Sequence, residues 1–233
     1  MHHAAIFPEN KWPRAITLNE LMIREGRKMS KSKGNVIPLA NVSELYGVDL
    51  YRLYCATNAD FATVVNWREQ DTEALRKRFN ALIAVFEESA GVAALSEDEF
   101  THSDRWLLSK FYRRLQESIE WFEGFRIREA GINMVFNLMN DIRYYEKRES
   151  VERRKRIVRN ILEEWLIILS PIVPHICEEL WHTFHDKPLL SLSGKPLQGL
   201  QGRGAEPAIA GSWGGAPQFY FNPNAAGNKR SVY

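Results

Sequence analysis

Cysteine is scarce in this chain, and the two cysteines that occur are widely separated. Cys55 and Cys177 are the only ones among 233 residues, and neither lies in a pattern of metal ligands. A disulfide framework and a cysteine-based zinc site are therefore excluded as organising features, and we predict no protein-bound metal. Each cysteine lies within an apolar helical pattern, so we expect both to be small buried residues.

Long apolar runs and a charge excess are also missing. No stretch reaches the ~18–20 apolar residues that a membrane span needs, and no signal peptide is recognisable. We therefore expect a cytoplasmic protein without a membrane partner. The net charge is only +2, with a pI near 8.5. The chain as a whole is not a polybasic nucleic-acid binder, so any such affinity must come from local clusters of basic residues.

Helical periodicity is what the chain has in abundance, from about residue 69 onward. Apolar residues recur at three- and four-residue intervals in four stretches, which predicts four amphipathic helices with short connections. The predicted fold class is therefore mainly α, with a helical bundle. The four apolar stripes are expected to form its core, and they comprise Leu75, Phe79, Leu82, Val85 and Phe86, then Leu108, Phe111, Leu115, Ile119 and Phe122, then Ile127, Ala130, Met134, Leu138, Ile142 and Tyr145, then Ile157, Ile161, Trp165 and Ile168.

Capping residues mark the expected helix ends within this bundle. Ser103 is predicted to cap the second long helix, and Ser150 the fourth. Pro171 and Pro174 are expected to end the fourth helix and to begin a short last one through Trp181.

The first 37 residues do not follow this helical pattern. Short apolar runs alternate with turns there, which favours the strand ends of a sheet. A helix is then predicted from Pro38 to Tyr46, stopping at Gly47, because helices favour proline at their start and glycine at their end. Asp49 is predicted to cap the next helix.

Residues 28–35 read Lys-Met-Ser-Lys-Ser-Lys-Gly-Asn and form the most distinctive stretch. Lysine carries a compact charge on a flexible stem, while serine and glycine keep a loop mobile and serine adds hydrogen-bond donors. Such a loop suits contact with an anion, above all in a reaction whose transition state gathers negative charge. A solvated basic loop is the alternative interpretation.

Residues 28–32 match the KMSKS signature of class I aminoacyl-tRNA synthetases residue for residue. Segments 3–9, 47–54, 66–69, 104–107, 140–145 and 174–181 resemble leucyl-tRNA synthetases of the archaeal and eukaryotic cytosolic type. The resemblance covers roughly residues 2–187 and departs from the family at Glu20, where a glycine is usual. It implies the end of a Rossmann-like α/β catalytic domain, followed by a helical bundle of the anticodon-binding type.

The resemblance also implies roles for the residues of the loop. Lys28 and Lys31 would be the catalytic residues that contact pyrophosphate, with Lys31 the more critical, and Met29 would lie near the adenine through its backbone. The partners would be leucine, tRNA(Leu) and ATP, with Mg²⁺ accompanying ATP as part of the substrate. The residues expected to bind ATP are Lys28, Met29, Ser30, Lys31 and Ser32.

A second signature of this class, His-x-Gly-His, is absent, because none of the six histidines has that context. Too few residues precede the loop for a doubly wound domain, whose βαβ units need about 30 residues each. We therefore expect a C-terminal portion of a larger synthetase that is inactive by itself. Isoleucyl- or valyl-tRNA synthetase is the alternative within the class, since segment 174–181 is common to all three. A non-catalytic tRNA-binding module is the alternative outside it.

Basic residues off the apolar stripes are the candidates for contact with tRNA. Cations suit phosphates, and the neighbouring Tyr144 and Tyr145 could stack on an unpaired base. The alternative is a solvated helix face with ion pairs, because glutamates are interspersed. The candidates are Arg143, Lys147, Arg148, Arg153, Arg154 and Arg156, with a smaller group at Arg76 and Lys77.

These features divide the chain into four predicted parts. Residues 1–37 would form the edge of the catalytic domain with the KMSKS loop, 38–75 a junction that contacts the tRNA stem, and 76–187 the helical bundle. Residues 188–233 are rich in glycine and proline and lack helical periodicity, which predicts an irregular tail.

Overall fold

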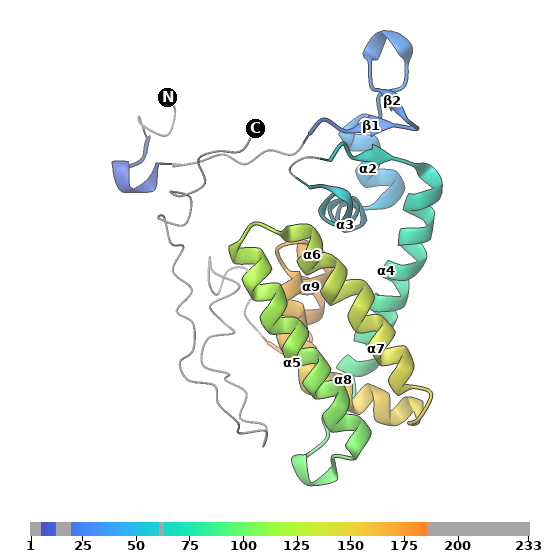
Figure 1. Cartoon of the computed structure of the whole chain (residues 1–233), viewed down its shortest axis with the longest axis vertical. Coiled ribbons are helices and arrows are strands. Elements are labelled where there is room, and N and C mark those ends of the chain that lie inside the picture. The colour runs from blue at the N-terminus through green and yellow to red at the C-terminus, as the bar shows by residue number, and fades with distance from the viewer. Residues whose placement is uncertain (1–5, 13–19, 61–62, 186–233) are drawn as a thin grey trace.

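A small sheet is joined to a helical bundle in the computed structural model, which describes residues 6–12, 20–60 and 63–185 (Figure 1). The mainly α fold class is confirmed, while the predicted tail at 188–233 lies outside the described residues. In chain order the elements are the 3-10 helix η1 (Glu9–Lys11), strands β1 (Ile23–Arg24) and β2 (Arg27–Lys28), the 3-10 helix η2 (Lys31–Lys33), helices α2 (Leu39–Tyr46) and α3 (Val48–Asn58), strand β3 (Asn66–Trp67), helix α4 (Glu69–Ala90), the 3-10 helix η3 (Glu97–Glu99), helices α5 (His102–Glu123) and α6 (Ile127–Gly131), the π-helical segment η4 (Ile132–Asn137), and helices α7 (Leu138–Tyr145), α8 (Val151–Leu169) and α9 (Pro174–Trp181).

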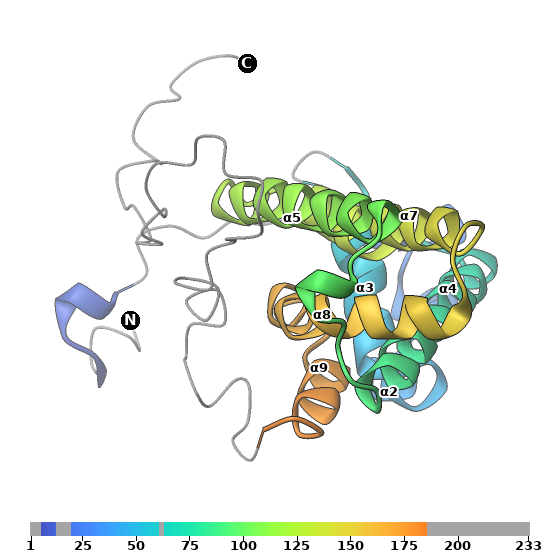
Figure 2. The same ribbon diagram turned by 90° about the horizontal axis from the view of Figure 1, so that it is seen from below.

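Helix α8 is the centre of the bundle. It packs against α4, α5 and α9, and Figure 2 shows α5 and α7 side by side as a layer over α8 and α9. The predicted stripe on α8 is fully buried, and Trp165 lies edge-on to Phe86 of α4 with ring centroids 4.7 Å apart. Each large apolar side chain buried in this way stabilises the fold by roughly 1.5–3 kcal/mol. The core stripes therefore hold the helices together as predicted.

The third stripe lies on a helical run that contains a π-helical segment. Helices α6 and α7 are continuous through η4, and the Met134 carbonyl in η4 accepts a hydrogen bond from the buried indole of Trp165 at 2.9 Å. Gly131 precedes η4, and a Cβ there would lie 3.3 Å from the side chains of Ile172 and Thr57. Glycine thus allows the close approach of this helix to α3. Ile127, at the start of the stripe, is exposed, so its predicted core position was wrong.

The cap predicted for α5 was wrong, whereas the cap predicted for α8 is confirmed. Ser103 lies inside α5, and the N-cap is Thr101. The Asp104 backbone amide donates to the Thr101 hydroxyl at 3.3 Å, and the Asp104 carboxylate accepts from the Thr101 amide at 2.7 Å. This reciprocal pair satisfies two amides at once, which a single serine cap would not. Ser150 caps α8, where its hydroxyl accepts from the amide of Arg153.

The cap predicted for α3 was also wrong, for a tertiary reason. Helix α2 follows Pro38 and ends at Gly47 as expected, but Gly47 is also the N-cap position of α3. Asp49 lies in the first turn of α3, and its carboxylate instead accepts hydrogen bonds from the backbone amides of His175 and Ile176 at 3.3 and 2.8 Å. Asp49 therefore caps α9, a helix distant in sequence, and ties it to α3.

Both cysteines are free thiols, as predicted. Cys177 is fully buried and Cys55 partly so, and burial raises the pKa of each thiol. Within the part of the chain that the structure describes, no helix is long and apolar enough to cross a membrane. The same residues contain no cluster of three or more His, Cys, Asp or Glu side chains that could hold a metal ion.

Candidate nucleotide loop and nucleic-acid interface

The lysine-rich loop extends from the hairpin formed by β1 and β2. Arg24 pairs with Arg27, so the hairpin turn consists of only two residues, Glu25 and Gly26. Both have positive φ angles, 47° and 73°. A type I′ turn needs this geometry, because its twist matches that of the flanking strands. Glycine adopts a positive φ readily, whereas glutamate does so rarely. Of the two turn residues, only Gly26 is therefore of a type that predicts this turn.

The loop is closed by the side chain of Asn35. The Asn35 side-chain oxygen accepts a hydrogen bond from the Ser30 amide at 2.8 Å, and its NH₂ group donates to the Lys28 carbonyl at 3.0 Å. Between these contacts η2 forms one 3-10 turn that ends at Gly34, whose φ of 64° is left-handed. The loop is therefore a compact turn with a fixed base.

The positive charges on this turn are not neutralised. Lys28, Lys31 and Lys33 are all exposed, and none forms an ion pair with another described residue. Three like charges on one small turn create a surface that attracts anions. The structure thereby brings together all the residues predicted to bind ATP, namely Lys28, Met29, Ser30, Lys31 and Ser32.

The hairpin is attached directly to the start of α4. The Glu25 carboxylate accepts a hydrogen bond from the Glu69 amide at 2.9 Å, and the Glu69 carboxylate pairs with Arg24 at 2.6 Å. The Asn66 side chain accepts from the Gly26 amide at 2.9 Å. Because the first amides of a helix lack partners within it, Glu25 satisfies one that would otherwise stay free. The base of the loop is thus fixed relative to the bundle.

A cluster of aromatic side chains packs the sheet against α2 and α3. Strand β3 lies parallel to β1, and its Trp67 is buried among Tyr46, Tyr51 and Tyr54, with ring centroids 4.6–5.7 Å apart. The Tyr54 hydroxyl donates to the Asn66 carbonyl at 2.6 Å, and burial raises the pKa of Tyr54. Burial raises the pKa of Tyr51 to about 12. Helices α2 and α3 therefore hold β3 in place, and the hairpin pairs with β3 through β1.

Two arginines predicted to contact tRNA are occupied by ion pairs in the structure. Arg154 is only 4% exposed, and its guanidinium pairs with Glu88 of α4 and with Glu146. Arg156 pairs with Glu99 at 2.9 Å. A buried, paired guanidinium cannot reach a phosphate without losing its partners, which is costly. Arg154 therefore serves the bundle, and the structure supplies no free charge at Arg156.

Arg153 is likewise part of a buried cluster, centred on Asp104. Its guanidinium lies 2.5 Å from the Asp104 carboxylate, which also accepts from the Tyr145 hydroxyl at 2.5 Å. Burial alone would raise the pKa of Asp104, but the hydrogen bonds from Arg153, Tyr145 and Thr101 outweigh it and hold this pKa below its ordinary value. The same cluster raises the pKa of Arg153. Tyr145 is thus a core residue and is not available to stack on a base.

The remaining candidates differ in their availability. Arg76 donates to the Leu45 carbonyl at 3.1 Å and lies over the Tyr46 ring, so it anchors the end of α2. The other four are exposed and form no ion pair within the described part of the chain, and these are Lys77, Arg143, Lys147 and Arg148.

A hollow of about 500 Å³ lies between α3, α4 and α9. Its lining includes Asp49, Phe79 and His175, and the His175 Nδ1 lies 2.7 Å from the Asp49 carboxylate. No residue of the lysine-rich loop lines it. The hollow is therefore separate from the predicted ATP-binding residues.

Comparison with known proteins gives two successive family matches. Residues 1–86 match a family described as class I (M) tRNA synthetases, and residues 104–206 match the anticodon-binding domain of tRNA ligases. A leucine–tRNA ligase from Staphylothermus marinus is 40% identical over 84% of this chain, and one from Archaeoglobus fulgidus is 38% identical over 84%. The chain belongs to the leucine–tRNA ligase family. The isoleucyl and valyl alternatives are therefore not favoured.

The matches cover most of this chain but only a small part of each relative. The chain spans only about 20% of the length of the leucine–tRNA ligases that it matches. The anticodon-binding match continues to residue 206, so likeness to tRNA ligases extends past residue 187, where the sequence had shown us no further resemblance.

A solved structure supports the fold. A crystal structure titled as the ternary complex of Agrobacterium radiobacter LeuRS with tRNA and LeuAMS superposes with a TM-score of 0.59. It is 22% identical, and the match covers 73% of this chain and 22% of that one. At this identity the likeness is one of fold, and it confirms the helical anticodon-binding type of bundle.

Proposed function

We propose that this chain supplies the KMSKS loop and the tRNA-binding helices of a cytoplasmic leucine–tRNA ligase. The complete reaction would activate leucine with ATP and Mg²⁺ and transfer it to tRNA(Leu). The observation that carries the proposal is the Asn35-closed turn, on which three lysines remain without a counter-charge. A solvated basic loop would need neither this closure nor the attachment of its hairpin to α4.

The role of the loop follows from where charge develops in the activation step. The leucine carboxylate attacks the α-phosphate of ATP, and pyrophosphate leaves with additional negative charge. Ammonium groups that approach the departing phosphates most closely in the transition state lower the barrier more than they strengthen ground-state binding. Lys28 and Lys31 would supply these charges, and Lys31, at the start of η2, would be the more critical.

A chimeric enzyme tests this proposal. The chain would replace the matching fifth of the Staphylothermus marinus leucine–tRNA ligase, and leucine-dependent ATP–pyrophosphate exchange would be measured. Lys31→Ala should slow exchange by about 30- to 1000-fold, since one lost transition-state contact costs roughly 2–4 kcal/mol. The KM for leucine should change little. Lys155→Ala is the matched control, because that lysine pairs with Glu152 on α8, far along the chain from the loop.

The non-catalytic alternative predicts a different outcome. The chain alone should catalyse no exchange under either interpretation, because it lacks His-x-Gly-His. A folded chimera that binds tRNA but activates no leucine would favour a tRNA-binding module and contradict the ligase proposal. An effect of Lys31→Ala confined to the KM for leucine would contradict the proposed role of that lysine.

A further inference from the structure

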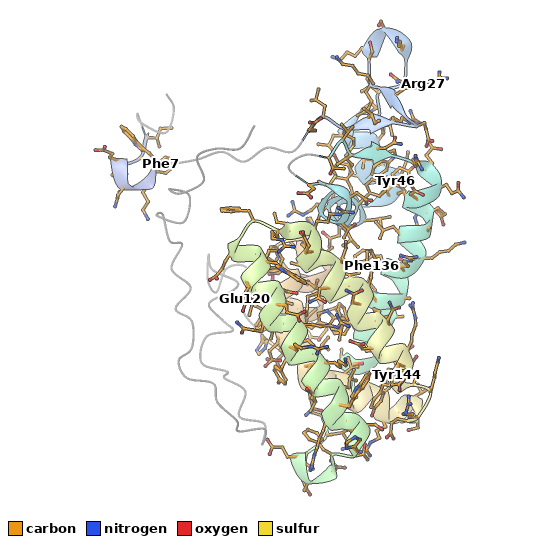
Figure 3. All side chains as sticks on the ribbon, in the orientation of Figure 1. Phe7, Arg27, Tyr46, Glu120, Phe136 and Tyr144 are labelled. Atoms are coloured by element: carbon orange, nitrogen blue, oxygen red, sulfur yellow. The ribbon has the colours of Figure 1, made fainter. Side chains whose placement is uncertain are left out.

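A pair of aromatic side chains, the half-buried Trp106 and the exposed Tyr144, lies at the opposite end of the bundle from the lysine-rich loop. Trp106 of α5 and Tyr144 of α7 have ring centroids 5.1 Å apart, with an angle of 48° between the rings. Tyr144 is 44% exposed, whereas the adjacent Tyr145 is buried and fills the core position. Figure 3 shows Tyr144 far from Arg27 of the hairpin. Because Tyr145 already supplies the core contact, Tyr144 is free to serve a surface role.

A cation flanks each of the two rings. The Arg148 guanidinium carbon lies 4.0 Å from the Tyr144 ring centroid, and its Nη2 donates to the Tyr144 hydroxyl at 2.6 Å. The Lys110 Nζ lies 5.7 Å from the Trp106 ring centroid. Lys110, Trp106, Tyr144 and Arg148 therefore form a row of successive contacts that crosses from α5 to the end of α7 and the turn after it. Cation–π attraction helps to hold the side chains of this row in place.

The surroundings of this row carry an excess of free positive charge. Asp141, Glu146 and Glu149 each form an ion pair with an arginine of α5 or α8. Arg143 and Lys147, in contrast, are exposed and form no ion pair with a described residue. The local acids are thus already occupied, and the cations beside the aromatic rings remain available to an anionic ligand.

We propose that Lys110, Trp106, Tyr144 and Arg148 form a stacking platform for an unpaired base of a bound RNA. Aromatic rings and guanidinium planes stack on any nucleobase, while neighbouring cations contact the flanking phosphates. An acidic protein segment would match the charge but would not require aromatic rings beside the cations. The inference rests on the proposed function, which supplies tRNA as the RNA. It adds that contact at this end of the bundle involves a base as well as the backbone.

The test measures binding of the whole chain to a short single-stranded RNA and to a blunt RNA duplex of the same length by fluorescence anisotropy. Tyr144→Leu should weaken binding of the single strand about 5- to 100-fold, the range expected for the loss of one stacked base. Duplex affinity and the salt dependence should stay unchanged, because no charge is removed. Tyr144→Phe should bind as the wild type does. Phe125→Leu is the matched control, since Phe125 is 45% exposed and lies beyond the other end of α5.

Several results would overturn the platform. The platform is contradicted if Tyr144→Leu binds the single strand as tightly as the wild type does. It is also contradicted if Tyr144→Leu loses affinity equally for the single strand and the duplex, because such a loss is not specific to an unpaired base. Tyr144-dependent binding of a polyglutamate peptide, with RNA binding unaffected, would assign the surface to a protein partner. Intact tRNA separates the two proposals. If the wild-type chain binds tRNA, and Tyr144→Leu changes neither its tRNA affinity nor its single-strand affinity, the platform is contradicted but the proposed function is not. A wild-type chain that binds no tRNA contradicts the proposed function.

Discussion

The buried carboxylate of Asp104 on α5 lies 2.5 Å from the guanidinium of Arg153 on α8. The same carboxylate accepts hydrogen bonds from the Tyr145 hydroxyl at the end of α7 and from the Thr101 amide before α5. Three helices of the bundle therefore meet at one buried negative charge. In a low-dielectric interior, such a charge is tolerated only while its hydrogen-bonding partners stay in place.

Removing this charge should destabilise the bundle. Asp104→Asn keeps the shape of the side chain but leaves Arg153 without its counter-charge, at an expected cost of about 2–4 kcal/mol in the free energy of unfolding. Urea unfolding at neutral pH measures this difference. Asp98→Asn, an exposed carboxylate in η3, is the control and should change stability by less than about 0.5 kcal/mol. Equal stability of Asp104→Asn and the wild type would show that the pair makes no net contribution.

The Asp104–Arg153 pair should also make the folded chain less stable at low pH. The pKa of Asp104 is lowered in the folded chain, so the folded state binds a proton less readily than the unfolded state does. Its contribution is therefore complete above the ordinary carboxyl pKa of 3.8 and is lost as pH falls through the folded value. The stability difference between wild type and Asp104→Asn should be constant from pH 7 to about 5 and shrink below about 4. A difference that grows on acidification would contradict the assignment of the charged form.

The sequence predicted the apolar stripes well because helical periodicity is a local signal that burial then confirms. It could not predict which distant polar groups would meet. Asp49 appeared to be a cap for its own helix but caps α9, and Arg154 appeared to face solvent but is buried between Glu88 and Glu146. Both depend on the packing of helices that are far apart in sequence. The candidate surface for RNA was therefore only partly predictable.

The loop shows the same limit at shorter range. The KMSKS match located the lysines, and the extension of the match included Asn35, but only the structure shows that Asn35 closes the turn. The hairpin beneath it was missed, because its turn has glutamate where asparagine or aspartate would have given the usual signal. Trp106 and Lys110 were also missed. The contact between Trp106 and Tyr144 arises from the packing of α5 against α7, and only this contact brings Trp106, with Lys110 one turn further along α5, beside Tyr144.

The free and the paired cations should affect tRNA binding differently. Replacing Arg143 and Lys147 together by Gln removes two exposed charges, which should lower the slope of log affinity against log salt by about 1–2 units. The matched double variant Lys155→Gln with Arg156→Gln removes charges that are already paired with Glu152 and Glu99, and its slope should stay near that of the wild type. Titration of labelled tRNA at several salt concentrations measures both.

The opposite ranking would contradict this division. If the paired cations lowered the slope and the free ones did not, the ion pairs on α8 would have to open when tRNA binds. The effect of Arg143 and Lys147 should also be similar for leucine and non-leucine tRNAs, because phosphates carry no sequence information.

Asn35 should act on catalysis by positioning the loop, without touching the substrate. In the chimeric enzyme described above, Asn35→Ala removes both hydrogen bonds that close the turn, so Lys31 would sample many positions instead of one. Two lost hydrogen bonds correspond to about 1–3 kcal/mol, or roughly 5- to 100-fold in the rate of leucine-dependent ATP–pyrophosphate exchange. The KM for leucine should stay close to the wild-type value, because the loop contacts the phosphates.

Asn35→Asp separates positioning from a simple folding defect. Aspartate can still accept from the Ser30 amide but cannot donate to the Lys28 carbonyl, so its exchange rate should lie between those of Asn35→Ala and the wild type. The aspartate charge beside the lysines also opposes phosphate binding, so the KM for ATP should rise in Asn35→Asp more than in Asn35→Ala. Asn80→Ala, an exposed asparagine on α4, is the control and should leave exchange unchanged. Wild-type exchange by Asn35→Ala would mean that closure of the turn is not needed for activation.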